Sequence, residues 1–130
     1  MPILTCENES PFNNLIRSPE NKALIYTAGY PNSAVKRFIF LFNDKHEFLH
    51  WGDSDPEGLE IAAILHKIKP LQLYRCGITD CQRLKSYLKP LTTRKQNRAK
   101  KMLEAGNCPF KQALEFTLQY GWLEQEAWEL

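Results

Sequence analysis

The chain has 130 residues, of which 43% are hydrophobic and 25% charged, so we expect one ordinary domain with a hydrophobic core. The formal net charge of +2 is too small to indicate nucleic acid by itself. The N-terminus lacks the charged start and apolar run of a signal peptide, and no apolar stretch is long enough to cross a membrane. Four cysteines (Cys6, Cys76, Cys81, Cys108) lack the paired spacing of a zinc site. We therefore expect a reduced, cytoplasmic protein without a membrane partner.

The first part of the chain alternates strand and helix patterns. Apolar and β-favouring runs predict strands over 3–6, 23–28, 48–51 and 71–76. Helices are predicted over 10–17, 33–42 and 56–68, each beginning at a capping residue: Ser10, Asn32 or Ser33, and Asp55. Strands that alternate with helices imply right-handed crossovers and a parallel sheet.

After Gly77 the alternation stops. Helical patterns cover 80–88, 95–104, 110–119 and 123–128, and Pro90, Gly106 and Gly121 separate them. The sequence therefore predicts an α/β fold with a four-stranded, mostly parallel sheet flanked by helices. We expect a single domain with its α/β core in residues 1–77 and a helical C-terminal extension in residues 78–130.

Three acidic residues follow two of the predicted strands. Glu7 comes directly after the first strand, and Asp53 and Asp55 come after the third. Because the carboxyl ends of parallel strands meet at one edge of the sheet, these side chains are expected to collect there. Oxygen donors without a histidine cluster suit Mg²⁺, with Mn²⁺ as the second candidate. Asp55 also fits a helix N-cap, since one oxygen can cap while the other faces the cation.

Two other known motifs contain a similar run of acidic residues. In a calcium-binding EF-hand loop beginning at Asp53, the bidentate glutamate of position twelve is replaced by Ile64. A phosphatase of the haloacid-dehalogenase type has a threonine two residues after its second aspartate, where this chain has Glu57. Both patterns therefore fit less well than a Mg²⁺ site built from Glu7, Asp53 and Asp55.

A basic stretch marks one predicted helix. It contains Arg94, Lys95, Arg98, Lys100 and Lys101. Lys95, Arg98 and Lys101 recur three apart and share a helix face. The stretch is either a solvated helix face or a surface that binds DNA phosphates, and the second interpretation predicts strongly salt-dependent binding.

Several sequence motifs resemble one known family. Glu7 after the first strand and Asp53-Ser54-Asp55 after the third resemble a Toprim domain. The order of four motifs is similar to the C-terminal part of JetD, the nuclease subunit of Wadjet plasmid-defence systems, which is related to the topoisomerase VI A subunit. These motifs lie at residues 6–12, 28–31, 51–58 and 122–126.

The resemblance implies a Mg²⁺-dependent DNA endonuclease with Glu7, Asp53 and Asp55 as catalytic metal ligands. Glu7 is alternatively a general base. It also implies DNA as substrate, condensin-like defence subunits as partners, and a homodimer. The alternative is a non-catalytic metal- and DNA-binding module that docks a partner subunit. The sequence shows no counterpart of the N-terminal winged helix that carries the nucleophilic tyrosine of the topoisomerase, so strand transfer through a tyrosyl intermediate is not expected.

Other polar residues are given lesser roles. His46, His50 and His66 have no metal-ligand spacing and are interpreted as structural or solvent-facing residues. Tyr30, in the loop after the second strand, is the tyrosine best placed for a functional role. Glu126 lies in the C-terminal motif, and by resemblance it could support the metal or its water. We leave Glu126 outside the core site.

Overall fold

The computed structural model describes residues 2–18 and 23–129. Its centre is a four-stranded sheet of β1 (Ile3–Cys6), β2 (Ala23–Tyr26), β3 (Phe48–Trp51) and β4 (Gln72–Leu73). The strand order is β2-β1-β3-β4, and every pair of neighbours is parallel. The predicted α/β fold is therefore confirmed, with an all-parallel sheet.

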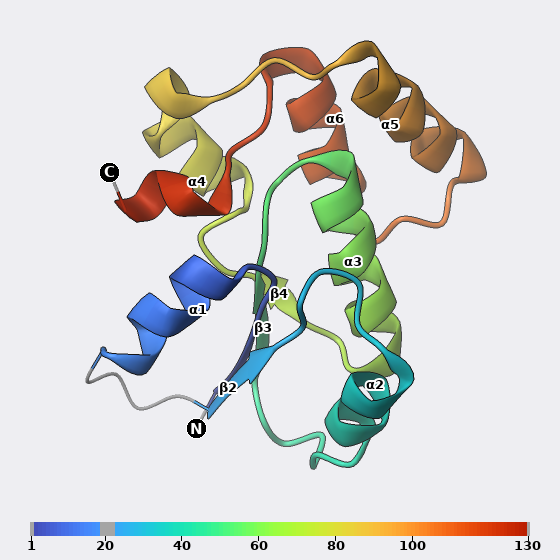
Figure 1. Ribbon diagram of the computed structural model, residues 1–130. Coiled ribbons are helices and arrows are strands. Elements are labelled where there is room, and N and C mark those ends of the chain that lie inside the picture. Colours follow the sequence, from blue (N-terminus) through green and yellow to red (C-terminus); the bar gives the residue numbers. More distant parts are fainter. Residues whose placement is uncertain (1, 19–22, 130) are drawn as a thin grey trace.

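Helices cover both faces of this sheet (Figure 1). Helix α1 (Glu9–Ile16) lies on one face, and α2 (Ser33–Phe40) and α3 (Pro56–Ile68) lie on the other. Successive strand residues point to opposite faces, so each strand contributes to two apolar layers. Ile3 and Phe48 pack with the α2–α3 side, whereas Leu4 and Trp51 pack with the α1 side.

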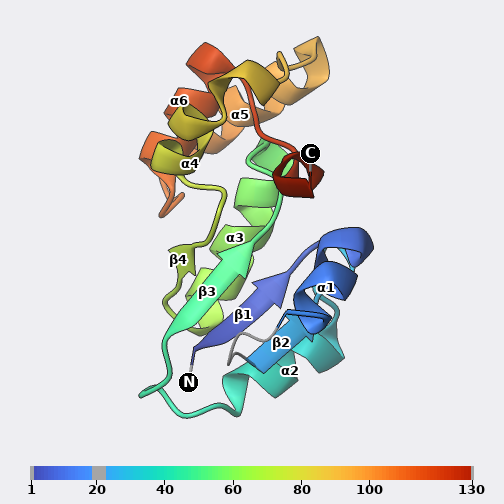
Figure 2. The same cartoon turned by 90° about the vertical axis from the view of Figure 1, so that its left-hand side faces the viewer.

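The remaining helices gather at the carboxyl end of the sheet (Figures 1 and 2). They are α4 (Ile78–Arg83), the 3₁₀ turn η1 (Lys85–Tyr87), α5 (Thr93–Ala105), α6 (Lys111–Tyr120) and the 3₁₀ turn η2 (Gln125–Glu129). Leu59 of α3 packs against Ala99 of α5 and Leu114 of α6, and all three side chains are buried. Helices α5 and α6 are therefore anchored on the first turn of α3.

Two helix starts follow the prediction and one does not. Asn32 and Asp55 cap α2 and α3, accepting hydrogen bonds from the backbone N–H groups of Val35 (2.9 Å) and Gly58 (2.8 Å). The predicted cap of α1 at Ser10 is wrong, because the helix begins at Glu9 with Asn8 as its N-cap. The Asn8 side chain makes no capping bond and turns instead toward the C-terminal segment.

The C-terminal half differs from the prediction in three elements. The helix predicted over 80–88 is divided into α4 (Ile78–Arg83) and the 3₁₀ turn η1 (Lys85–Tyr87). β4 covers two residues of the predicted six, and Arg75 has a left-handed backbone (φ 58°) that interrupts the extended chain. The segment predicted as a helix over 123–128 is the 3₁₀ turn η2. All four cysteines are free thiols. Over residues 2–18 and 23–129, no helix has the length and apolar character needed to cross a membrane.

Gly58, in the first turn of α3, generates the first prediction. A Cβ at this position would overlap the Asp53 carbonyl oxygen and lie 2.8 Å from its carbon atom. Gly58→Ala is therefore expected to destabilise the protein by about 2 kcal/mol, more than the gain in helix propensity. Urea unfolding would measure this destabilisation. Gly77→Ala is the control, since a Cβ at position 77 would lie 3.7 Å from its nearest atom, an ordinary contact distance. Equal stability of the two variants would contradict the prediction.

Candidate metal centre

Two acidic side chains meet where β1 and β3 end. The chain continues to β2 on one side of β1 and returns to β3 on the other, so the carboxyl ends of β1 and β3 form the switch point at which open α/β sheets bind ligands. The Asp53 backbone N–H donates to Glu7 Oε2 at 3.0 Å. Glu7 is 9% exposed. The structure thus places Glu7 and Asp53 side by side, as the strand positions predict.

Gly52 makes this approach sterically feasible. A Cβ at position 52 would overlap Glu7 Oε2 and lie 2.9 Å from His50 Nε2. Any other residue at position 52 would therefore push the Glu7 carboxylate away from the end of β3. The requirement for glycine here comes from close packing of side chains, since the Gly52 backbone is not left-handed.

The surroundings of both acids oppose their ionisation. Burial and the nearby charge of Asp53 raise the pKa of Glu7 to about 8. Burial also raises the pKa of Asp53 to about 6, with a further contribution from Asp55. Among the described residues, no lysine or arginine forms an ion pair with either carboxylate. The pair is therefore an electrostatically unfavourable cluster that an added cation would stabilise.

Asp55 is near enough to this pair to raise the pKa values of both acids, but its oxygens are occupied by other groups. Its Oδ1 accepts the Gly58 N–H as the cap of α3, and its Oδ2 is paired with Lys95 Nζ. Lys95 also lies 3.4 Å from Glu57 Oε2. Burial opposes the charged form of Lys95, but the hydrogen bond to Asp55 and the charge of Asp55 outweigh it and raise the pKa of Lys95. The cap that one Asp55 oxygen forms on α3 was predicted. The second Asp55 oxygen was expected to face a metal ion and instead faces the Lys95 ammonium group.

A C-terminal segment completes the site from the other side. The Gln125 backbone N–H donates to Asp53 Oδ1 at 2.7 Å, and the buried Gln125 side chain accepts from the Asn8 N–H (3.1 Å) and donates to Cys6 Sγ (2.9 Å). Glu126 Oε1 accepts from Asn8 Nδ2 at 3.0 Å. The negative charge of Glu126 contributes to the raised pKa values of Glu7 and Asp53. Residues 125–126 therefore hold both acidic loops in register.

The residues fit a divalent cation only in part. Across residues 2–18 and 23–129, no three Asp, Glu, His or Cys side chains converge closely enough to hold a metal ion as they stand. Glu7 and Asp53 are the acids that match, since they share one hydrogen bond, are hard oxygen donors and lack a cationic partner among the described residues. These two residues would hold the metal, and Asp55 would join them only after leaving Lys95.

The histidines take structural positions. His50 is fully buried, and burial lowers its pKa to about 4, so the ring is neutral. Its Nδ1 lies 2.7 Å from Thr5 Oγ1, while its buried Nε2 finds no partner among the described residues. His66 Nδ1 accepts the Leu71 N–H at 3.0 Å, and the His46 ring stacks edge-on against Phe42.

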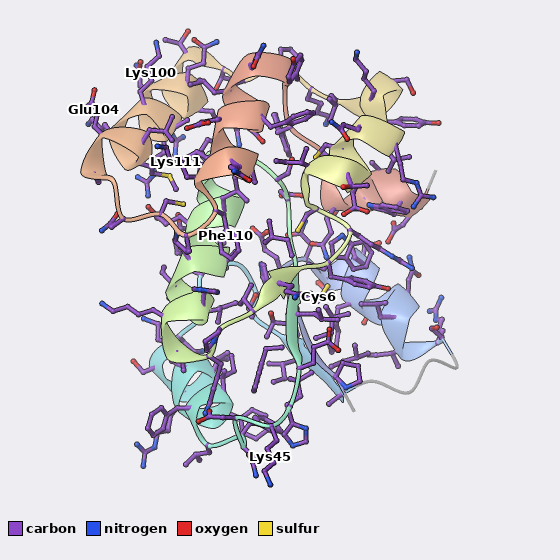
Figure 3. The ribbon with its side chains drawn as sticks, turned by 180° about the vertical axis from the view of Figure 1, so that it is seen from behind. Cys6, Lys45, Lys100, Glu104, Phe110 and Lys111 are labelled. Carbon is purple, nitrogen blue, oxygen red and sulfur yellow. The ribbon has the colours of Figure 1, made fainter. Side chains whose placement is uncertain are left out.

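The predicted DNA-binding residues divide into two groups on α5. Lys95 and Arg98 face α3, where Arg98 Nη2 lies 2.5 Å from Glu60 Oε1. Arg94, Lys100 and Lys101 are exposed, and Figure 3 shows Lys100 on the outer side of α5, away from the sheet. Lys95 and Arg98 are therefore ion-paired within the protein, although Arg98 is 43% exposed, and the other three cations, which form no ion pair among the described residues, are the ones available to a polyanion.

Tyr30 follows β2, as predicted, and its hydroxyl donates to Glu60 Oε1 at 2.7 Å. Burial and this acceptor raise the pKa of Tyr30 to about 12. A neutral, hydrogen-bonded phenol is a poor nucleophile.

Gln125 is the residue of the site that sequence reasoning missed. It is separated from Asp53 by 72 positions, and its main contact is made by a backbone N–H that any residue type other than proline provides. The one available signal was its place within the C-terminal Trp122–Glu126 motif of the resembling family.

The structure is that of an α/β protein with a parallel sheet, and two of its carboxylates lie at the switch point, the edge at which open α/β sheets generally bind ligands. A family model described as the C-terminal part of Wadjet protein JetD matches residues 1–130, and the chain belongs to this family. This membership confirms the resemblance drawn from the motifs and relates the chain to the Wadjet system. No curated protein matches the chain significantly.

The raised pKa of Glu7 generates a prediction for stability in the absence of metal. Below about pH 4.5 both folded and unfolded chains hold the Glu7 proton. As the pH rises from there to about 8, the unfolded chain loses this proton first, so the free energy of unfolding should fall. Glu7→Gln should remove on the order of 3 kcal/mol of this decrease.

Urea unfolding with chelator at pH 5 and pH 9 would measure this difference. Adding Mg²⁺ at pH 9 should stabilise the wild-type protein and leave Glu7→Gln almost unchanged. Glu104→Gln, an exposed acid on α5, is the matched control and should behave as wild type. The same pH dependence in Glu7→Gln and wild type would show that Glu7 ionises normally.

Proposed function

We propose that this domain is a Mg²⁺-dependent DNA endonuclease that hydrolyses phosphodiester bonds within a Wadjet plasmid-defence system. One observation carries the proposal: Glu7 and Asp53 are forced together at the switch point, with raised pKa values and no cationic partner among the described residues. Bound Mg²⁺ would activate water and offset charge on the scissile phosphate. Family membership and the likeness of the Asp53–Asp55 loop to a Toprim domain support the same chemistry.

The protein's own residues have separate roles in this proposal. Glu7 and Asp53 bind the cation, and the Gln125 N–H fixes the orientation of Asp53. The exposed cations of α5 bind the DNA backbone. In the reaction a water oxygen bonds to phosphorus and gives up a proton to solvent, the bond from phosphorus to the leaving sugar oxygen breaks, and that oxygen takes up a proton from solvent. Alternatively, Glu7 is a general base instead of a metal ligand, and its raised pKa then suits it to take up the proton of the attacking water near neutral pH.

Asp53→Asn tests the proposal directly. Because it removes a charged ligand while keeping the side-chain shape, nicking of supercoiled plasmid in Mg²⁺ or Mn²⁺ should slow at least about a hundredfold, which corresponds to ~3 kcal/mol in the barrier. Chelator should abolish nicking by the wild-type protein, and Glu104→Gln should cleave normally. Circular dichroism would show that Asp53→Asn is folded. Unchanged nicking by folded Asp53→Asn would disprove the assignment.

The second candidate is a metal- and DNA-binding module without turnover that docks a partner subunit. The pairing of Asp55 with Lys95 favours it, because only two of the three predicted ligands stand together. Retention of plasmid by the wild-type protein with Mg²⁺ but without cleavage would support this alternative.

The exposed basic residues generate a separate prediction for DNA binding. Replacing Arg94, Lys100 and Lys101 with Ala should weaken binding to all sequences alike, because interactions with phosphates carry no sequence information. Each DNA phosphate that the variant no longer neutralises should flatten the slope of log K against log salt by ~0.9, and three such phosphates by about three. Fluorescence anisotropy over a salt series would measure both effects.

The matched control replaces three cations at the other end of the molecule, Lys36, Arg37 and Lys45. They are exposed, and Figure 3 shows Lys45 far from Lys100. A salt slope that changes equally in both triple variants would indicate nonspecific attraction to the whole surface.

A further inference from the structure

The Lys95 side chain lies inside the acidic loop that follows β3. Its ammonium group is paired with Asp55 Oδ2, lies 3.4 Å from Glu57 Oε2, and stands 4.6 Å from the centre of the Trp122 ring. The side chain is 24% exposed. Two carboxylates and an aromatic face therefore hold one positive charge at a defined position beside the candidate metal centre.

This pairing divides the acidic cluster into two halves. Asp55 is 5% exposed, and a carboxylate so deeply buried needs a compensating charge, which Lys95 provides. Glu7 and Asp53 contact no such group among the described residues, although Asp55 is near enough to influence the pKa values of both. One half of the cluster already contains its cation, and the other half does not.

We propose that the Lys95 ammonium is a built-in cation of this centre, which takes at Asp55 and Glu57 the place that a second divalent ion occupies in two-metal phosphodiester hydrolysis. Glu7 and Asp53 then bind a single divalent ion. The inference rests on the proposed function, since it concerns the same site. It makes Lys95 a residue that determines how many metal ions the site accepts.

The chemistry of an ammonium group suits this role. Two-metal sites stabilise the attacking and leaving oxygens with two charges about 3.5–4 Å apart. Lysine presents a compact charge with three N–H donors. Asp55 and Glu57 accept two of them, so a third N–H has no oxygen acceptor among the described residues and is available to a phosphate oxygen.

The position of Lys95 is fixed by the fold. Its backbone N–H donates to Thr92 Oγ1, the N-cap of α5, at 3.2 Å. Ala99, one turn further along α5, is fully buried against Leu59 of α3. These two contacts position the first turn of α5, from which the Lys95 side chain extends to the acidic loop.

Counting bound Mn²⁺ tests the inference without measuring activity. Titration calorimetry, with free Mn²⁺ checked by electron paramagnetic resonance, should give one ion per wild-type chain. Lys95→Met keeps packing against Trp122 but frees Asp55 and Glu57, so the count should rise to two, with the second ion bound more weakly. Lys95→Arg keeps the charge and should remain at one. Adding Asp55→Asn to Lys95→Met should return the count to one.

Arg94→Met is the matched control, because it removes a neighbouring exposed charge of α5 and should leave the count at one. A wild-type count of two, or a count of one in folded Lys95→Met, would overturn the inference while leaving the proposed function in place. Failure of the wild-type protein to bind Mn²⁺ would overturn both. The wild-type count stands as a test even where a variant fails to fold.

Discussion

The hydrogen bond from the Asp53 N–H to Glu7 Oε2 is the constraint on which the site depends. It brings the buried Glu7 carboxylate and the half-buried Asp53 carboxylate together at the ends of adjacent parallel strands, where their charges repel. The arrangement requires a residue without a side chain at Gly52 and a tight turn into α3 at Gly58. The fold therefore accepts a local electrostatic cost at its carboxyl edge, which is typical of a binding site rather than of a stabilising core.

The C-terminal segment is part of the same construction. The Ser54 N–H donates to the Leu123 carbonyl at 3.0 Å, and the Leu123 N–H donates to Ser54 Oγ at 2.6 Å. Gln125 then contacts Asp53 and the loop after β1. The loops that follow β1 and β3 are joined directly by the Asp53–Glu7 hydrogen bond. Residues 123–126 add further hydrogen bonds to both loops, so the helical extension organises the site as well as covering the sheet edge.

How far the sequence predicts this structure depends on the range of the interactions involved. The parallel strands and the Asn32 and Asp55 caps follow from local patterns, and they brought Glu7 and Asp53 together correctly. The cap of α1 was predicted at Ser10 instead of Asn8, because the Asn8 side chain bonds to the distant Glu126 and not to the first turn of its own helix. The partner of Lys95 lies 40 positions away, and only the packing of α5 on α3 brings them together. Periodicity shows that Lys95 and Arg98 share a face but not which surface that face meets.

Asp53 and Asp55 are separated by a single residue but belong to different environments. Asp53 is still in the loop and faces the end of β1, whereas Asp55 has already begun α3 and faces α5. The change of direction follows from the transition between strand and helix. Through Lys95, the acid that caps α3 also fixes the start of α5, and with it the exposed Arg94, Lys100 and Lys101. A single short loop thus sets the geometry of the acidic pair and the position of the positive surface that a polyanionic substrate would need beside it.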